Sequence, residues 1–568
     1  MKAFTEPLLS LAGFEEMTKT AEKSSGLISV TGCIDAQKSQ MIYAFGGHRK
    51  NKLIVTFGEQ KAKELYDEYS FFDKEVVYYP SKDVLFYQSD IRVNLLTAER
   101  IRALKAIHEQ ESVTLVTTFD ALMNTMAPIE KMWENVLTLE QGQLLDLKEI
   151  QAALIRMGYE KEYQVQTMGQ FSVRGGILDV FPLTEENPIR IELWGDEIDT
   201  IRYFDCESQK SIENTDRVSI YPAAELVLSD EEKAGGIEKL KAEAKRVSDK
   251  LRKQMKTEEA HRVTVMADEL TEEWGELSMY AGMDAFLSYF FDERVGLLDY
   301  FNPSDSLIFF DELTRCAEQG KLTETEFSES MKQRLAMGYI LPGQMNGLFT
   351  EKEIVAKLEK YSCIALGALD NKANGLHQLG SYGIHCQSVS PYNNSFELLI
   401  KDLKRYKKNG YRVILLSGSR TRAKRLSEDI TDQGITCFYT ENYDHELSEG
   451  QIMVCYGKVR RGFEYPILKF AVITESDIFG AQQKKKKRHR TYEGEKIQSF
   501  TDLSVGDYVV HENHGLGIYR GIEKLEVDKK VKDYIKIEYQ GGSNLYILAT
   551  QLDMIQKYAG KDARKPRL

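Results

Sequence analysis

The sequence lacks any long hydrophobic run, and this absence sets the first limits on the protein. No apolar stretch among its 568 residues approaches the roughly 18 residues that a transmembrane helix needs. The first residues, MKAFTEPLLSLAGFEEM, carry early glutamates and no clean apolar core, which excludes a secretory signal. We therefore expect a cytoplasmic protein that makes no contact with a membrane.

The sequence also has few cysteines and no net positive charge. The seven cysteines are scattered and never form a C-x-x-C pair, which excludes a disulfide framework and a zinc site. The formal net charge of −13 excludes a surface coated with basic residues for nucleic acid, although a local basic patch could exist. The apolar fraction of 42% is typical of globular domains, and the length predicts roughly four of them.

The first part of the chain alternates predicted strands and helices. Apolar strands are expected at 27–32, 53–57, 76–79 and 113–119, and helices at 35–45, 59–69 and 97–108. This order predicts a parallel α/β sheet. Further along, 231–257 is rich in Lys and Glu and predicts a solvated helix, and 307–310 predicts a buried strand.

From about residue 160 the pattern changes to β. The segment IRIELW at 189–194 alternates apolar and polar residues, which predicts a strand with one buried and one solvated face. Arg190 and Trp194 would share the solvated face, and Arg174 precedes a Gly-Gly kink nearby. Exposed arginine and tryptophan are typical of an interface hot spot, and a solvated sheet with an Arg–Glu pair is the equal alternative.

The last third of the sequence predicts two further folded units. Between 385 and 480, helices at 396–407 and 419–433 alternate with strands at 412–417, 452–456 and 470–475. The run KKKKRHR at 484–490 then predicts either a solvated tether or a patch that contacts phosphates. A compact β unit with Gly turns follows at about 501–556. The final residues show no obvious end of a fold, so we expect a truncated sequence.

The turn after the first strand resembles a phosphate-binding loop. It reads GCIDAQKS at 32–39, and the pattern G-x-x-x-x-G-K-[ST] is met by Gly32, Lys38 and Ser39. Gln37 stands where the second glycine belongs, and its side chain would obstruct the approach of backbone amides to a phosphate. Asp311 and Glu312, after a distant apolar strand, resemble the acidic pair that holds Mg²⁺. This pattern favours a degenerate structural relic over an active ATPase.

No other constellation predicts catalysis. His511 and His514 have the spacing of a metal pair, but they flank a β turn, whereas the HExxH geometry needs a helix. They are better interpreted as polar turn residues. We therefore predict no metal site and no catalytic residue, and the chain is interpreted as an assembly of docking modules.

Two long segments resemble a known family. The segment FSVRGGILDVFPLTEENPIRIELWGDEIDTIRYFD at 171–205 closely resembles a stretch shared by the excision-repair protein UvrB and the Mfd family of bacterial transcription-repair coupling factors. The segment LSVGDYVVHENHGLGIYRGIEKLEV at 503–527 resembles the RNA-polymerase-interacting module that these factors share with CarD-type regulators. Their order, with a basic linker between them, resembles the N-terminal part of a coupling factor and not UvrB.

The resemblance implies a multidomain α/β architecture. It implies a degenerate RecA-like P-loop domain in two parts, an inserted UvrA-interacting α+β domain, a second small α/β domain of unknown role, a basic linker and an SH3/Tudor-like β-barrel. The corresponding boundaries are 1–125 and 216–384 for the RecA-like domain, 126–215 for the insert, 385–480, 481–500 and 501–556, with 557–568 opening the next segment.

The same resemblance implies two partners. Arg174, Arg190 and Trp194 match the family's UvrA contacts. Ile522, Lys524 and Leu525 lie in the matching strand that docks on the RNA polymerase β subunit by strand addition. The chain would be a monomeric docking part of a transcription-coupled repair factor that recognises stalled polymerase and recruits UvrA.

The family's ATP-driven motor is expected beyond residue 568, so the resemblance places Mg-ATP and most double-stranded DNA binding there and no cofactor in this chain. An active nucleotide hydrolase and a CarD-type regulator without a repair role are the alternatives.

Overall fold

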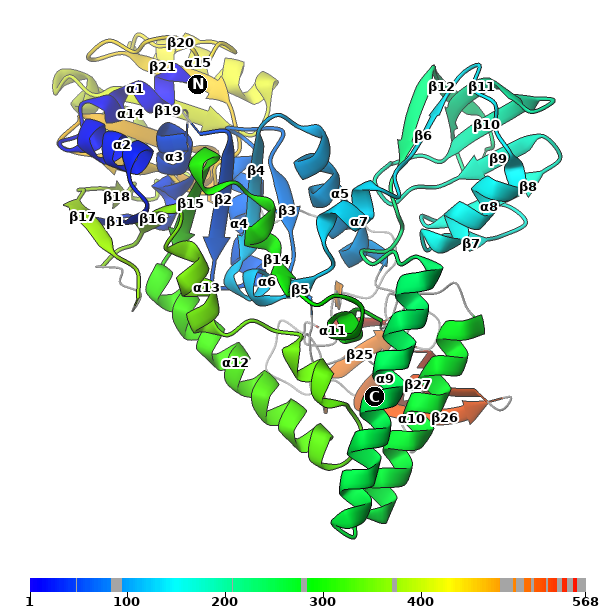
Figure 1. Cartoon of the computed structure of the whole chain (residues 1–568). Coiled ribbons are helices and arrows are strands. Elements are labelled where there is room, and N and C mark those ends of the chain that lie inside the picture. Colours follow the sequence, from blue (N-terminus) through cyan, green and yellow to red (C-terminus); the bar gives the residue numbers. More distant parts are fainter. Residues whose placement is uncertain are drawn as a thin grey trace.

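The computed structural model describes residues 1–46, 49–82, 94–206, 208–276, 283–369, 375–480, 494–496, 505–511, 515–527, 530–538, 544–548 and 555–558. These residues form several α/β and β units, each with its own sheet, and the expected multidomain α/β class is confirmed (Figure 1). None of the helices in the described ranges is both long and apolar enough to cross a membrane.

The N-terminal unit is built on a seven-stranded parallel sheet with the order β17-β1-β16-β15-β2-β4-β3. Its strands are Gly26–Thr31 (β1), Asn51–Thr56 (β2), Val77–Tyr79 (β3), Val113–Thr118 (β4), Ser306–Asp311 (β15), Ser362–Leu366 (β16) and Gln378–Gly383 (β17). Its principal helices are Asp35–Phe45 (α3), Glu59–Tyr69 (α4), Asn94–Glu109 (α5), Leu313–Ala336 (α12) and Glu351–Leu358 (α13). The expected strands and helices of this region therefore form, and the sheet is parallel as predicted.

The central strands of this sheet are largely buried and are covered on both faces, as expected for a parallel sheet, whereas the edge strand β17 is more polar and has no buried residue. Residues of β4 and β15 are all buried, and they contribute to two hydrophobic clusters on opposite sides. The loops that follow β1 and β15 leave the same edge of the sheet, because the two strands are parallel. This arrangement brings Lys38 and Asp311 together although 273 residues separate them.

The second unit is a six-stranded sheet with the order β12-β11-β10-β9-β8-β7. Its strands are Glu160–Lys161 (β7), Gln170–Arg174 (β8), Ile177–Val180 (β9), Ile189–Trp194 (β10), Glu197–Phe204 (β11) and Ser211–Thr215 (β12), and a separate pair joins Leu137–Glu140 (β6) to Arg217–Ile220 (β13). The alternation predicted at 189–194 is confirmed, since Ile189 and Ile191 are buried in a cluster that includes Leu154 of helix α8 (Leu147–Arg156). Helix α8 covers this apolar face, which leaves the other face for polar residues.

The solvated helix predicted over 231–257 forms as Asp230–Lys253 (α9). A second, antiparallel helix that the sequence did not predict, Thr257–Glu276 (α10), follows it (Figure 1). The chain reverses at Met255, whose φ of 64° lies in the left-handed region. The reversal has a physical cause: Leu240 and Leu251 form an apolar stripe on α9, and α10 folds back to bury it.

The third unit, near the N-terminal one, carries a six-stranded sheet with the order β18-β22-β23-β19-β21-β20. Its elements are Gln387–Ser388 (β18), Phe396–Lys408 (α14), Arg412–Ser417 (β19), Arg420–Asp432 (α15), Phe438–Tyr439 (β20), Ile452–Tyr456 (β21), Phe463–Tyr465 (β22), Phe470–Thr474 (β23) and Glu475–Phe479 (α16). It shares a buried cluster with the first sheet, and Tyr465 Oη donates to Gln40 Oε1 at 3.2 Å. The two units therefore form one continuous hydrophobic interior.

The C-terminal β unit is antiparallel, with the order β24-β29-β25-β26-β27-β28. Its strands are Gly494–Lys496 (β24), Tyr508–His511 (β25), Gly515–Val527 (β26), Lys530–Glu538 (β27), Asn544–Leu548 (β28) and Ile555–Tyr558 (β29). The buried apolar residues among its described positions include Val509, Tyr519, Ile535, Ile537 and Ile555. The basic run at 484–490 and the end of the chain at 559–568 lie outside the described residues, and the RecA-like and SH3/Tudor-like assignments remain predictions.

Candidate functional site

The loop that resembles a phosphate cradle is occupied by the protein's own backbone. The amide of Gly32 donates to Ala368 O at 3.2 Å, and the amide of Cys33 donates to Gly367 O at 3.0 Å. Gly32 has a φ of +79°, and a Cβ there would lie 2.1 Å from Ile384 O. These backbone donors would have to face a phosphate in a working loop. Here they are already satisfied by carbonyl groups.

The lysine of the loop is held by three carboxylates. Its Nζ lies 2.5 Å from Asp311 Oδ1, 3.0 Å from Glu312 Oε1 and 3.0 Å from Asp35 Oδ1. Lys38 and Asp311 are both 1% exposed. Thr56 Oγ1 also donates to Asp311 Oδ2 at 3.0 Å, so both oxygens of this carboxylate are engaged.

The electrostatics of this cluster favour charged groups. Burial disfavours the ammonium of Lys38, but Asp311, Asp35 and Glu312 outweigh that effect and raise its pKa above the ordinary value. Desolvation also works against ionisation of Asp35, yet Lys38 and Lys61 hold the pKa of that carboxyl at about 2. The arrangement is therefore a buried ion-pair cluster. In it the two acidic residues that resemble a magnesium pair neutralise the lysine.

We expect that the chain does not bind Mg-ATP. Binding would require the amides of Gly32 and Cys33 to leave their carbonyl partners and Lys38 to leave a buried carboxylate. The side chain of Gln37, which is fully buried beside the loop, would have to move as well. Isothermal titration calorimetry of the chain with Mg-ATP should show no saturable heat. Micromolar binding that disappears in Lys38→Ala would contradict this prediction.

The face of the second sheet opposite helix α8 carries an arginine cluster organised by one aspartate. Arg190 makes two hydrogen bonds to Asp179, Nε to Oδ1 at 2.7 Å and Nη2 to Oδ2 at 2.9 Å, and Nη2 also reaches Gln209 at 2.8 Å. Arg174 donates to the same Asp179 at 3.0 Å. Asp179 itself is buried. One carboxylate therefore fixes both guanidinium groups in place.

The exposure expected for Arg190 was wrong. The side chain of Arg190 is only 13% exposed and that of Arg174 is 36% exposed, because Asp179 draws both toward the sheet. Trp194 is 84% exposed, as predicted. The pairing of β10 with β11 shifts register between Glu192 and Leu193, so Trp194 lies beyond an irregularity at the tip of the hairpin.

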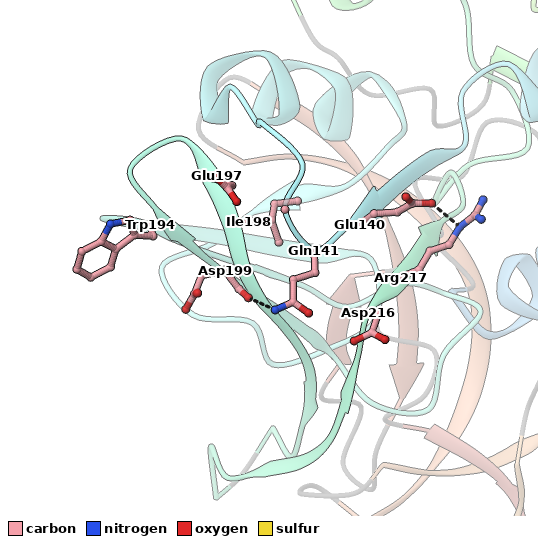
Figure 2. Close-up of a pocket in the computed structure, with 9 residues that line it drawn as sticks. Glu140, Gln141, Trp194, Glu197, Ile198, Asp199, Asp216 and Arg217 are labelled. Atoms are coloured by element: carbon pink, nitrogen blue, oxygen red, sulfur yellow. Dashed lines mark hydrogen bonds and ion pairs between the residues drawn. The ribbon is translucent and has the colours of Figure 1, made fainter.

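Trp194 lines an open acidic groove of about 680 Å³ that neither arginine lines (Figure 2). The other lining residues are Glu140, Gln141, Gly142, Glu197, Ile198, Asp199, Asp216 and Arg217. Arg217 pairs with Glu140 at 3.3 Å, and Gln141 donates to the backbone oxygen of Asp199. The structure therefore brings Arg174 and Arg190 together and places Trp194 beside a negatively charged groove.

The strand expected to contact polymerase has an open edge. Residues 515–518 of β26 pair with β25, whereas 522–527 pair only with β27 within the described part of the chain. The register shifts between Tyr519 and Ile522, and Gly521 there has a φ of +103°. Ile522 is half-buried, and the side chains of Lys524 and Leu525 lie outside what the structure describes.

The histidine pair provides no support for a metal centre. His514 lies outside the described residues, and His511 ends strand β25, so the pair is not on a helix. A search of the described ranges finds no cluster of three or more His, Cys, Asp or Glu side chains that could hold a metal ion.

Two family models match the units that carry these features. The UvrB interaction domain matches residues 137–226, and the CarD-like/TRCF RID domain matches residues 503–559. Similar proteins extend the likeness to nearly the whole chain. The chain is 31% identical over 518 residues to the transcription-repair-coupling factor of Bacillus subtilis (strain 168), with 91% of this chain and 43% of that protein covered. The chain resembles the transcription-repair-coupling factors.

Other relatives with the same name align over a similar share of this chain. The factor of Staphylococcus haemolyticus (strain JCSC1435) is 29% identical over 553 residues, covering 95% of this chain and 46% of that protein. That of Staphylococcus aureus (strain USA300) is 28% identical over 570 residues, covering 98% and 47%. The chain thus spans less than half the length of these transcription-repair-coupling factors.

The structure adds functional candidates that the sequence did not reveal. Asp179 positions both arginines that the resemblance to the coupling factors implied. The acidic residues around Trp194 come from β6, from β11 and from the residue between β12 and β13. The register of β9 against β10 would have revealed the role of Asp179, because this residue stands directly opposite Arg190. The groove depends on tertiary placement that no local pattern encodes.

Proposed function

We propose that this chain is a docking part of a transcription-coupled repair factor, in which one unit recruits UvrA and another binds the RNA polymerase β subunit. The observation that carries the proposal is the presence on one chain of matches to the UvrB interaction domain and to the CarD-like/TRCF RID domain, in that order. The relatives named transcription-repair-coupling factor, which align over 91–98% of the chain, support the same role.

The geometry of the second sheet suits recognition of a protein partner. Asp179 holds Arg190 and Arg174 in fixed positions, so little side-chain entropy is lost when a partner contacts them. Trp194 provides a large exposed aromatic surface, and Trp and Arg are the residue types that dominate binding energy at interfaces. Fixed guanidinium groups would then orient the partner, and the indole would provide apolar contact.

The open edge of β26 suits strand addition. Backbone donors and acceptors at 522–527 have a strand neighbour on one side only within the described residues. A partner strand can pair with the free side, and alternate side chains then select it. Ile522 and Lys524 on one side of the strand, and Leu525 on the other, would contact the polymerase β subunit.

In this proposal the N-terminal sheet keeps the RecA-like arrangement as a scaffold without hydrolysing nucleotide. The satisfied loop amides and the buried Lys38–Asp311 pair support that role. ATP-driven translocation on double-stranded DNA would belong to motor domains outside this sequence. A CarD-type regulator without a repair role is disfavoured by the match at 137–226 to the UvrB interaction domain.

Truncation of Trp194 tests the UvrA surface. We expect Trp194→Ala to weaken UvrA affinity by about 2 kcal/mol or more, or roughly thirtyfold, because a hot-spot aromatic is lost. Biolayer interferometry with purified UvrA measures the change. Since Trp194 is 84% exposed, the thermal unfolding midpoint should not move. Ile467→Ala, which removes a side chain that is 76% exposed in the third unit, is the matched control and should bind UvrA normally.

Arg190→Ala should also weaken UvrA binding, but this variant leaves buried Asp179 with Arg174 as its one ion-pair partner among the described residues and should lower stability. Trp194→Ala is therefore the variant that tests the proposed UvrA surface. If Trp194→Ala binds UvrA as tightly as the parent chain, the docking surface has been misassigned.

A further inference from the structure

The helical hairpin formed by α9 and α10 has a strongly uneven charge distribution. Residues 239–262, at the end that carries the turn, contain nine Lys and Arg against four Asp and Glu. The remainder, 230–238 with 263–276, contains one Lys against nine Asp and Glu. The tip is therefore basic in a chain whose net charge is −13. Nothing in the proposed docking function uses it.

The basic tip is structurally well defined. Leu240 and Leu251 of α9 pack in one cluster with Val263 of α10, and Ser248 Oγ donates to Ala260 O at 3.1 Å across the pair. The turn is closed by the amide of Lys256, which donates to Leu251 O at 3.0 Å. Figure 1 shows the hairpin extending away from the N-terminal sheet, with its turn at the lower edge of the view.

Four lysines of α9 near the turn face solvent, and their charges have no partner among the described residues. Lys241, Lys245, Lys250 and Lys253 are exposed, and their side chains form no ion pair or hydrogen bond with the described residues. Other cations nearby are engaged. Lys239 pairs with Asp292 at 3.0 Å, and Arg262 donates to Met337 O and lies over the Tyr339 ring.

The four lysines form an array suited to a polyanion. Lys241 and Lys253 are 12 helical steps apart, or about 18 Å, over which a DNA duplex carries about ten phosphate charges. The exposed surface between them consists of charged residues and Ala242, with no aromatic anchor. Protein interfaces are depleted in lysine and enriched in aromatic residues, so this face fits a phosphate backbone better than a protein partner.

We propose that the tip of the α9–α10 hairpin binds the phosphate backbone of duplex DNA without reading its sequence. The choice of DNA over RNA rests on the proposed repair function, whereas the backbone contact rests on the lysine array alone. This contact would belong to the docking part itself and would be separate from any motor.

Fluorescence anisotropy of the full chain with a fluorescein-labelled 30-base-pair DNA duplex tests the proposal. In the parent chain, affinity should fall steeply between 50 and 200 mM salt. Lys245→Glu/Lys250→Glu/Lys253→Glu should weaken binding at least tenfold and make the salt slope of log K shallower by about three, since three phosphate contacts are lost. The Gln version of the triple variant should show a smaller loss in the same direction.

A control of equal charge change is available on α14. Lys401→Glu/Lys404→Glu/Lys408→Glu alters exposed lysines of another basic helix and should leave DNA affinity within twofold of the parent. Circular dichroism confirms that each variant is folded. Binding of UvrA by the hairpin variant should be unchanged, so failure of this proposal and failure of the proposed UvrA docking are distinguishable.

Five results would overturn the proposal. They are no DNA binding by the parent chain at 50 mM salt, equal losses in the hairpin and α14 variants, and loss on neutralising Lys484 to Lys487 while the folded hairpin variant binds normally. The fourth is at least tenfold tighter binding of a duplex RNA of the same sequence. If the hairpin variant lost affinity for RNA polymerase and not for DNA, the array would be a protein-docking surface and the proposal would be wrong.

Discussion

Replacing Lys38 with methionine should lower the free energy of unfolding by about 3–5 kcal/mol, because the change leaves a buried carboxylate without its cation. Asp311 is 1% exposed, and its remaining hydrogen bond comes from the neutral hydroxyl of Thr56. A nucleotide-binding lysine would behave differently, since its removal affects ligand affinity more than the fold. The midpoint of urea denaturation, followed by circular dichroism, measures the loss.

Lys61→Met is the matched control for Lys38→Met. Lys61 also pairs with Asp35, at 2.9 Å, but that carboxyl side chain is 70% exposed. An exposed ion pair contributes little, so this variant should lose less than about 1 kcal/mol. Removing both buried charges in Lys38→Met/Asp311→Asn should recover more than half of the loss caused by Lys38→Met alone. Equal destabilisation by Lys38→Met and Lys61→Met would mean that the buried pair does not stabilise the fold.

The sequence predicted elements well where local signals and burial agreed. Helices at 35–45 and 59–69 form with those bounds, because apolar strands and loop residues delimit them on both sides. The helix expected over 231–257 ended at Lys253 instead. Its Lys and Glu content indicated solvent, but the apolar stripe of Leu240 and Leu251 required a covering helix, and α10 supplies it.

The candidate sites were predicted less completely, because their decisive contacts are tertiary. The motif around Lys38 indicated a damaged phosphate loop, but only the fold shows that Ala368 and Ile384 fill the space. Arg190 was correctly assigned to the face opposite the apolar cluster, while its engagement by Asp179 required the register of two neighbouring strands. The acidic groove beside Trp194 depends on three separate segments and could not be read from any of them.

Replacing Leu525 with arginine should reduce affinity for the RNA polymerase β subunit at least thirtyfold, below detection in a pull-down. Residues 522–527 of β26 offer an edge that is unpaired on one side within the described residues, and Leu525 stands opposite Lys532 on β27. Strand addition at this edge would place the side chain of residue 525 at the partner's surface. A buried arginine without a counter-charge there is strongly unfavourable, and a hot-spot loss of about 2 kcal/mol or more corresponds to that fold-change.

Two variants separate loss of docking from loss of folding. Leu525→Ile keeps the apolar volume and should bind the β subunit nearly as well as the parent chain. Ile467→Arg adds the same charge at a position that is 76% exposed in the third unit, and it should leave polymerase binding unchanged. Circular dichroism of Leu525→Arg should match the parent, because the ladder between β26 and β27 uses backbone groups that the substitution retains. Retained pull-down of the β subunit by folded Leu525→Arg would place the polymerase contact on another surface. In that case the free edge of β26 would not mediate strand addition.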